Sequence, residues 1–184
     1  LTRIACAYTK TTYTNILNGR LNKNEWLRYR YALEKIKQSD MTIYDTSAPS
    51  PLFIRSKINE TFNKKGYVDL ILVDYLQLLG SDRKHGSRAD EVSYFAQSMK
   101  EIAKEFDTHV IALSQLNREV EKRVDKRPML SDMKESSSIE QAADAVFGLY
   151  REEYYTGNSI GVAELIGLKG RNTATGTIYL GFIK

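Results

Sequence analysis

Asp74 is the residue whose position in this sequence points most directly to chemistry. It interrupts an otherwise apolar stretch from Leu70 to Tyr75, which is short enough for a strand buried on both faces and too short to span a membrane. A carboxylate at the end of a buried strand loses its hydration unless it meets a cation. One interpretation is therefore that Asp74 reaches Mg²⁺, usually through a water, at the carboxyl edge of a parallel sheet. The alternative is a capping or turn aspartate.

A second apolar run ends in polar residues of a similar kind. His109–Leu113 is followed directly by Ser114 and Gln115. If both runs are parallel strands, their carboxyl ends meet at one edge, where open α/β sheets bind ligands. A glutamine there can hydrogen-bond a terminal phosphate or orient water. The alternative is a loop amide paired with backbone.

Helices and strands with short connections must position these residues. Capped amphipathic helices are expected after Asn22 or Asn24, from Pro51 to Lys65, and after Ser87, where Val92, Phe95, Met99, Ile102 and Phe106 form the buried stripe. Further strands are expected at Met41–Asp45 and Ala145–Tyr150, with a closing hairpin of Val162–Leu168 and Thr175–Ile183. Alternation of strands and helices predicts an α/β fold with a mainly parallel sheet flanked by helices.

The composition limits the function classes. With 184 residues, 27 Lys+Arg and 23 Asp+Glu, the chain is long enough for one domain with a real core, and its charge of +4 permits nucleic-acid binding without requiring it. The single cysteine and two histidines offer no metal-ligand spacing. No apolar run approaches 18 residues and no signal-like start is present, so we expect a cytoplasmic protein that does not enter membranes.

Two polar segments are candidates for binding a charged partner. Arg118–Arg127 carries five basic and three acidic residues, so it must be surface or a binding loop. Gly80–Arg88 is a second polar loop and contains Arg83, Lys84 and His85. The simpler explanation for both segments is that their charged side chains are exposed to solvent and bind no partner.

Several long motifs, in order, resemble one known family. They are Leu70–Leu78, Ile111–Arg118, Asp125–Pro128, Ser131–Ser136 with Ile139–Gln141, Tyr150–Arg151 and Lys169–Asn172. Together they resemble the RecA-like motor domain of the DnaB-type hexameric replicative helicases, bacterial or phage. The resemblance covers about Thr14 to the end. It implies a RecA-like P-loop NTPase core with a C-terminal β-hairpin.

The resemblance implies roles for four residues in ATP hydrolysis. Asp74 matches the Walker B carboxylate that acts on Mg²⁺, and Gln115 matches the family's phosphate-sensing glutamine. Lys169 and Arg171 match a basic pair that extends across a subunit interface toward a neighbour's γ-phosphate, where a guanidinium can stabilise developing charge. The simpler alternative for this pair is a solvated hairpin turn.

The resemblance also places single-stranded DNA in the central channel of a ring. The segment Ser131–Ser138 matches a channel loop, and the DNA-binding residues it implies, with those of the Arg118–Arg127 loop, are Arg118, Arg123, Lys126, Lys134, Glu135 and Ser137. The family commonly has arginine at Lys134 and glycine at Ser137. Lysine keeps the charge but loses the bidentate fork, and serine restricts the backbone's approach to phosphate.

The phosphate-binding motif Gly-x-x-x-x-Gly-Lys-Ser/Thr is absent, and no Gly-Lys pair occurs. Leu1 begins inside an amphipathic pattern with no cap before it. We therefore expect residues 1–184 to be part of a helicase ATPase domain truncated on its N-terminal side, with the phosphate loop and general-base glutamate upstream. Alone it should bind ATP poorly and not hydrolyse it.

The implied partners are single-stranded DNA, other copies in a homo-hexamer, a primase and a helicase loader. Two alternatives remain. One is a non-catalytic RecA-fold module for DNA binding or assembly, which never had the phosphate loop. The other is a RecA-type recombinase, which would not be expected to carry Asp125–Pro128 together with the Lys169–Arg171 pair.

Overall fold

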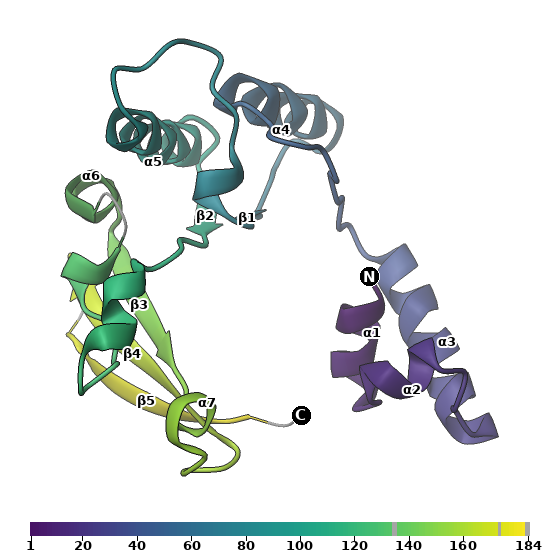
Figure 1. Ribbon diagram of the computed structural model, residues 1–184. Coiled ribbons are helices and arrows are strands. Elements are labelled where there is room, and N and C mark those ends of the chain that lie inside the picture. The colour runs from purple at the N-terminus through teal and green to yellow at the C-terminus, as the bar shows by residue number, and fades with distance from the viewer. Residues whose placement is uncertain (134–135, 173, 183–184) are drawn as a thin grey trace. The chain divides into compact units, whose positions relative to one another are not determined.

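The computed structural model describes residues 1–133, 136–172 and 174–182, which form two compact units, one within 1–45 and one within 46–182 (Figure 1). The first unit contains α1 (Thr2–Thr9), α2 (Tyr13–Leu17) and α3 (Lys23–Gln38). Ala5 from α1 packs against Tyr29 and Ala32 of α3. Asn22 caps α3 by accepting from the Glu25 N–H at 2.9 Å, while the Glu25 carboxylate accepts from the Asn22 N–H.

The prediction of a strand at Met41–Asp45 is wrong. These residues are irregular and exposed. A strand needs hydrogen bonds from a neighbouring strand, and no described segment pairs with this one. Residues with a high β-propensity do not form a strand when that neighbouring strand is missing.

The second unit contains the elements that carry the candidate site. Its helices are α4 (Pro51–Lys65), η1 (Leu76–Leu78), α5 (Arg88–Glu105), η2 (Arg118–Lys122), η3 (Leu130–Asp132), α6 (Ser136–Ala142) and α7 (Glu152–Thr156), and its strands are β1 (Leu70–Val73), β2 (His109–Ala112), β3 (Ala145–Tyr150), β4 (Val162–Gly170) and β5 (Gly176–Gly181). As expected, Pro51 lies in the first turn of α4, Gly66 ends that helix, and Ser87 caps α5. The structure adds a cap that was not predicted, because the Ser50 side chain accepts from the Phe53 N–H at 3.2 Å.

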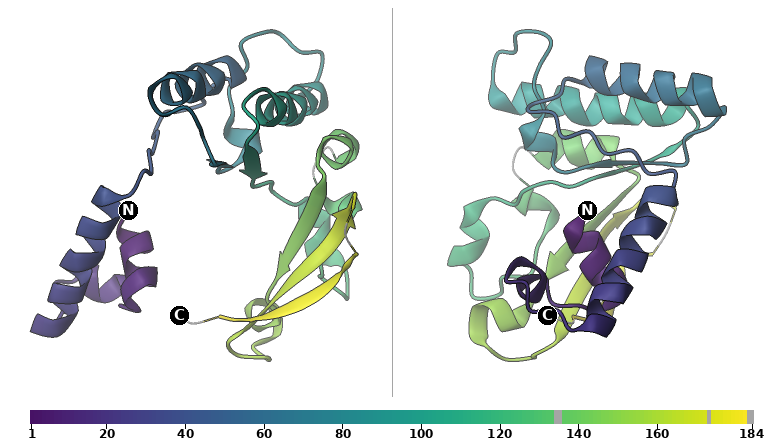
Figure 2. Two further views of the ribbon diagram at one scale, coloured as in Figure 1. Left: turned by 180° about the vertical axis from the view of Figure 1, so that it is seen from behind. Right: turned by 90° about the vertical axis from the view of Figure 1, so that its right-hand side faces the viewer.

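The strands of this unit form two sheets. β1 and β2 pair in parallel, from Leu70 opposite His109 to Val73 opposite Ala112. β3, β4 and β5 form an antiparallel sheet in that order, which confirms the C-terminal hairpin (Figures 1 and 2). The parallel pairing predicted for the two apolar runs is confirmed, while the more extensive pairing in the described residues is antiparallel.

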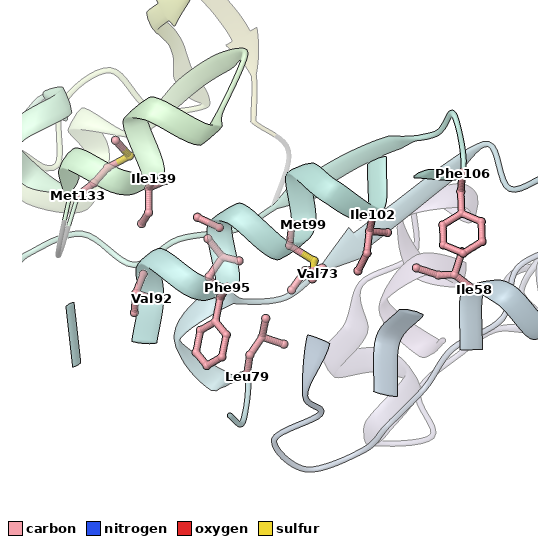
Figure 3. Packing of buried hydrophobic residues seen from close by; sticks show 12 residues of the cluster. Ile58, Val73, Leu79, Val92, Phe95, Met99, Ile102, Phe106, Met133 and Ile139 are labelled. Atoms are coloured by element: carbon pink, nitrogen blue, oxygen red, sulfur yellow. The ribbon is translucent and has the colours of Figure 1, made fainter. Parts of the chain in front are cut away.

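The main core lies between the helices α4 and α5 and one face of β1 and β2. Phe95, Met99 and Ile102 project from α5 into a cluster that includes Val73 and Leu79 (Figure 3). The prediction that both faces of β1 are buried is wrong for the described residues. Leu72 is 68% exposed, and Ile111 of the neighbouring β2 is 52% exposed. Only the face with Ile71 and Val73 meets the helices. Helices therefore cover a single face of the parallel pair.

None of the helices in the described ranges combines the length and apolarity that crossing a bilayer demands.

Candidate functional site

The carboxyl ends of β1 and β2 meet at one edge, as their parallel pairing requires. The Leu113 N–H donates to the Val73 carbonyl at 2.9 Å, and the Leu76 N–H donates back to the Leu113 carbonyl at 2.9 Å. Asp74 follows the first strand directly, and Ser114 and Gln115 follow the second. The predicted proximity of the two strand ends is therefore present in the structure.

Asp74 is an exposed carboxylate at this edge. Within the described ranges it has no hydrogen-bond or ion-pair partner, and no group of three or more His, Cys, Asp or Glu side chains could hold a metal. Mg²⁺ commonly uses one or two carboxylates, with water and substrate phosphates supplying the remaining ligands. A single free carboxylate fits that mode of binding and does not form a site for a permanently bound metal.

Gln77 connects the two strand ends and was missed by the sequence reasoning. Its side-chain Nε2 donates to the Ser114 Oγ at 2.9 Å, and its Oε1 accepts from the Gln115 N–H at 3.2 Å. The signal that could have found it is a lone amide between apolar residues, three positions after Asp74. Half-buried, Gln77 needs hydrogen-bond partners, and both come from the second strand end.

The segment after Gln115 runs beside the first residues of the expected channel loop, Ser131–Ser138. Leu116 forms an antiparallel bridge with Met133, and the Asn117 N–H donates to the Asp132 carbonyl at 2.6 Å. Lys134 and Glu135 lie outside the described residues. Ser137 is exposed on α6. The two segments expected to meet DNA are thus joined through backbone hydrogen bonds.

Arg123, expected to bind DNA, is engaged inside the protein. Its guanidinium donates to both carboxylate oxygens of Asp132, at 2.9 and 2.6 Å, and to the Arg127 carbonyl at 2.8 Å. The side chain of Asp132 is 9% exposed and also accepts from the Met129 N–H at 2.8 Å. This bidentate pair ties the basic segment down, so Arg123 has a structural role in the described chain.

Arg127 makes a second bidentate pair. It donates to Glu164 of β4 at 2.8 and 2.7 Å, and its guanidinium stacks on Tyr150. The hydrogen bond with Glu164 raises the pKa of Arg127 above its usual value. The Arg127 N–H lowers the pKa of Asp125 by donating to its carboxylate. Much of the charge in this segment is therefore used to fold it.

Arg118 and Lys126 remain available for an external anion. Arg118 is exposed at the start of η2 and has no partner within the described ranges. Lys126 is half-buried, with its Nζ 5.2 Å from the centre of the Tyr155 ring. Arg118 is consequently the more accessible cation of the two.

The loop that contains Arg83–His85 is also partly folded onto α5. The Arg83 guanidinium lies 3.8 Å from the centre of the Tyr94 ring, and the Tyr94 hydroxyl donates to Asp82 at 2.8 Å. Burial of the ring, followed by its bond to Asp82, raises the pKa of Tyr94. The nearby carboxylate offsets the charge of Arg83, which weakens the case for this loop as a phosphate contact.

Lys169 and Arg171 both lie at the C-terminal end of α6. The Lys169 ammonium donates to the carbonyls of Glu140 and Ala143, and the Arg171 guanidinium donates to the Gln141 carbonyl at 3.0 Å. Cations at this end satisfy carbonyls that the helix leaves unpaired and favour its dipole. The pair is therefore placed by α6, whose first residues belong to the expected channel loop.

Asp144 adds a negative charge beside this pair. Its carboxylate accepts from Lys100 of α5 and lies 3.3 Å from an Arg171 nitrogen. The bond from Lys100 lowers the pKa of Asp144. Arg171 is nevertheless 53% exposed in its side chain, so part of its guanidinium remains open to solvent.

The adjoining strand ends with Asp74 and Gln115, and the helices that pack on one face, define a RecA-like ATPase domain. The chain belongs to the DnaB-like helicase C-terminal domain family, whose model matches residues 1–184. The expected fold class and the resemblance are both confirmed.

Similar proteins of known name support this assignment. The chain is 41% identical over 185 residues to replicative DNA helicase DnaB of Geobacillus stearothermophilus, and 42% identical over 186 residues to replicative DNA helicase DnaC of Bacillus subtilis. Each match covers 99% of this chain and 40% of the relative. The chain thus spans about two-fifths of the length of these curated relatives.

Two solved structures share the fold. A DnaB-like replicative helicase, solved in a study of its interactions with primase, superposes with a TM-score of 0.94 at 37% identity, over 100% of this chain and 45% of that one. A second solved protein, an ATPase domain, superposes with a TM-score of 0.92 at 36% identity, over 98% of this chain and 66% of that one.

Proposed function

We propose that the chain is part of the motor of a replicative DNA helicase, which uses ATP hydrolysis to move along single-stranded DNA and unwind the duplex. The observation that carries this proposal is the placement of Asp74 and Gln115 on adjoining strand ends, joined by Gln77. This edge of the sheet is where nucleotides bind in open α/β folds. The family membership supplies the reaction class.

In this proposal each residue has a distinct task. Asp74 would hold Mg²⁺ through water, and a bound Mg²⁺ would supply positive charge to the phosphate oxygens of ATP. Gln115 senses the terminal phosphate. Lys169 and Arg171 serve the site of a neighbouring subunit in a homo-hexamer.

The phosphate-binding loop must come from outside these residues, because its motif is absent from the sequence. We propose that residues 1–184 form part of an ATPase domain to which a preceding segment adds this loop. The greater length of the curated relatives leaves room for it. Residues 1–184 alone are then expected to bind ATP poorly and not to hydrolyse it.

Four further assignments belong to the proposal. Single-stranded DNA is the polymer bound, through Arg118, Lys126, Lys134, Glu135 and Ser137. A primase is a candidate partner, since a similar helicase was solved in a study of its primase interactions. A helicase loader is a second candidate partner. The cytoplasm is the proposed location.

The test is DNA-stimulated ATPase activity of the full-length protein, measured beside residues 1–184. We expect hydrolysis only by the full-length protein, and acceleration by single-stranded DNA. If neither hydrolyses ATP, the alternative is a RecA-fold module for DNA binding or assembly. The missing phosphate-loop motif is the observation that favours that alternative.

Arg118→Ala is expected to weaken single-strand binding and to reduce its salt dependence. Each phosphate contact on a single strand contributes about 0.7 to the slope of log K against log salt, because a condensed counterion is released. The slope of an oligo(dT) titration should therefore fall by about 0.7. Lys37→Ala, on the exposed charged face of α3, is the matched control. An unchanged slope for Arg118→Ala would remove this residue from the DNA contact.

A further inference from the structure

We infer that Gln77 is a positioning residue that holds the backbone of Gln115 and thereby couples the nucleotide edge of the sheet to the DNA-facing segments. The inference rests on the proposed function and adds a residue that the family resemblance did not assign. It is carried by the hydrogen bonds on both sides of Gln115.

The amide of Gln77 has only one productive orientation. The Gln115 backbone N–H can only donate, so the Gln77 Oε1 must face it, at 3.2 Å. The Nε2 then points to the Ser114 Oγ, which accepts at 2.9 Å. A single side chain therefore holds two successive residues at the end of β2.

The end of β2 has few other attachments at this point. Gln115 lies beyond the last residue pair of the β1–β2 ladder, Val73 with Ala112. Gln77 is the one partner found for the Gln115 N–H within the described ranges. Loss of the amide would leave this N–H to solvent and free the backbone that carries the Gln115 side chain.

Gln77 itself is firmly held. It lies in η1 between Leu76, which is 3% exposed, and the buried Leu79. The Gln77 carbonyl accepts from the Arg88 guanidinium at the start of α5. The Leu76 N–H bonds to Leu113. When this strand end moves, Gln77 therefore stays in place, and Gln115 and the residues after it move.

The segment after Gln115 leads directly to the DNA-facing residues. Leu116 bridges to Met133 and the Asn117 N–H donates to Asp132, one and two positions before Lys134. Arg118 comes next along the chain. A change in the Gln115 backbone is thus passed to both DNA-facing segments over two or three residues.

The test compares Gln77→Leu, which removes both hydrogen bonds at similar size, with Gln77→Glu. A glutamate keeps an acceptor for the Gln115 N–H, and the Ser114 hydroxyl can donate to it. Ser114→Ala removes only the hydrogen bond between the Gln77 Nε2 and the Ser114 hydroxyl. Gln97→Leu is the control for the loss of an exposed glutamine, because the Gln97 Nε2 makes a long hydrogen bond of 3.4 Å to Glu101 within α5.

Two quantities are measured in the full-length protein. The first is hydrogen exchange of the Gln115 amide without nucleotide, expected to rise at least about 10-fold in Gln77→Leu. The second is the ratio of oligo(dT) affinities with and without a non-hydrolysable ATP analogue and Mg²⁺. This ratio should fall roughly 5- to 10-fold in Gln77→Leu, a common size for coupling between sites. Gln77→Glu should keep both values near wild type, and Ser114→Ala should lie between.

Each outcome decides the inference. Unchanged exchange, or faster exchange with an unchanged affinity ratio, overturns it. If Gln77→Leu does not fold, Gln77→Ala takes its place, and unchanged exchange or an unchanged affinity ratio in that variant overturns the inference. If the wild-type protein itself shows no effect of nucleotide on DNA affinity, the proposed function fails and the inference falls with it. That result is distinguishable because it appears before any substitution is made.

Discussion

Arg171→Ala is expected to lower the ATPase rate of the full-length protein by about 10³- to 10⁵-fold, the range known for guanidiniums that stabilise phosphoryl transfer. The affinity of each subunit for ATP should change little, because Arg171 is proposed to act on the site of a neighbouring subunit. Steady-state ATPase and nucleotide-binding titrations measure the two quantities. Arg20→Ala, an exposed arginine in the first unit, is the control.

Mixed subunits provide the sharper version of this test. Subunits with Asp74→Asn retain Arg171, and subunits with Arg171→Ala retain Asp74. Mixing the two should restore part of the activity, because some interfaces then combine an intact Asp74 with an intact Arg171. Normal turnover by Arg171→Ala alone, or the absence of any recovery on mixing, would contradict a role across the interface.

The structural role of Arg171 is small enough to be separated from its proposed catalytic one. In the described chain it donates one hydrogen bond to the Gln141 carbonyl and lies near Asp144. Loss of such a bond costs about 0.5–1.5 kcal/mol of unfolding free energy. The variant should therefore stay folded, with a melting temperature only a few degrees below wild type.

Asp132→Ala is expected to lower the free energy of unfolding by about 3–5 kcal/mol, the usual cost of removing one partner of a buried ion pair. The substitution leaves the Arg123 guanidinium half-buried without its carboxylate and removes the acceptor of the Met129 N–H. Urea denaturation measures the loss. Asp125→Ala is the control, because Asp125 is an exposed aspartate of the same segment, and loss of its bond from the Arg127 N–H should cost only about 0.5–1.5 kcal/mol.

A double substitution tests the physical cause. Arg123→Leu combined with Asp132→Leu removes both charges and should recover much of the stability lost in Asp132→Ala. Equal losses for Asp132→Ala and Asp125→Ala would contradict the assignment of Arg123 to a buried pair. Arg123 would then return to the residues proposed to contact DNA.

The sequence alone determined the local elements and the family. The caps at Asn22 and Ser87 and the apolar spacing within α3 and α5 are local signals, because they depend on residues three or four positions apart. The parallel pairing of β1 and β2 followed from strand, helix and strand in succession. Motif order then identified the family, which the comparisons confirmed.

Local signals failed where a distant partner was required. The run Met41–Asp45 has strand composition but no neighbouring strand within the described residues. Leu72 has the residue type of a buried strand but lies on the uncovered face. Strand pairing and burial depend on what lies opposite, and no window of sequence contains that information.

Only the tertiary structure decided which charged and polar residues are internal. Arg127 pairs with Glu164 across 37 positions, Gln77 with Gln115 across 38, and Lys169 with the Ala143 carbonyl across 26. In the sequence Arg118, Arg123 and Arg127 are equivalent basic residues of one segment. The fold separates them because Asp132 and Glu164 are nearly buried, and a buried carboxylate must be paired. Arg123 and Arg127 therefore form ion pairs within the protein, and Arg118 is the arginine of this segment that stays exposed to solvent.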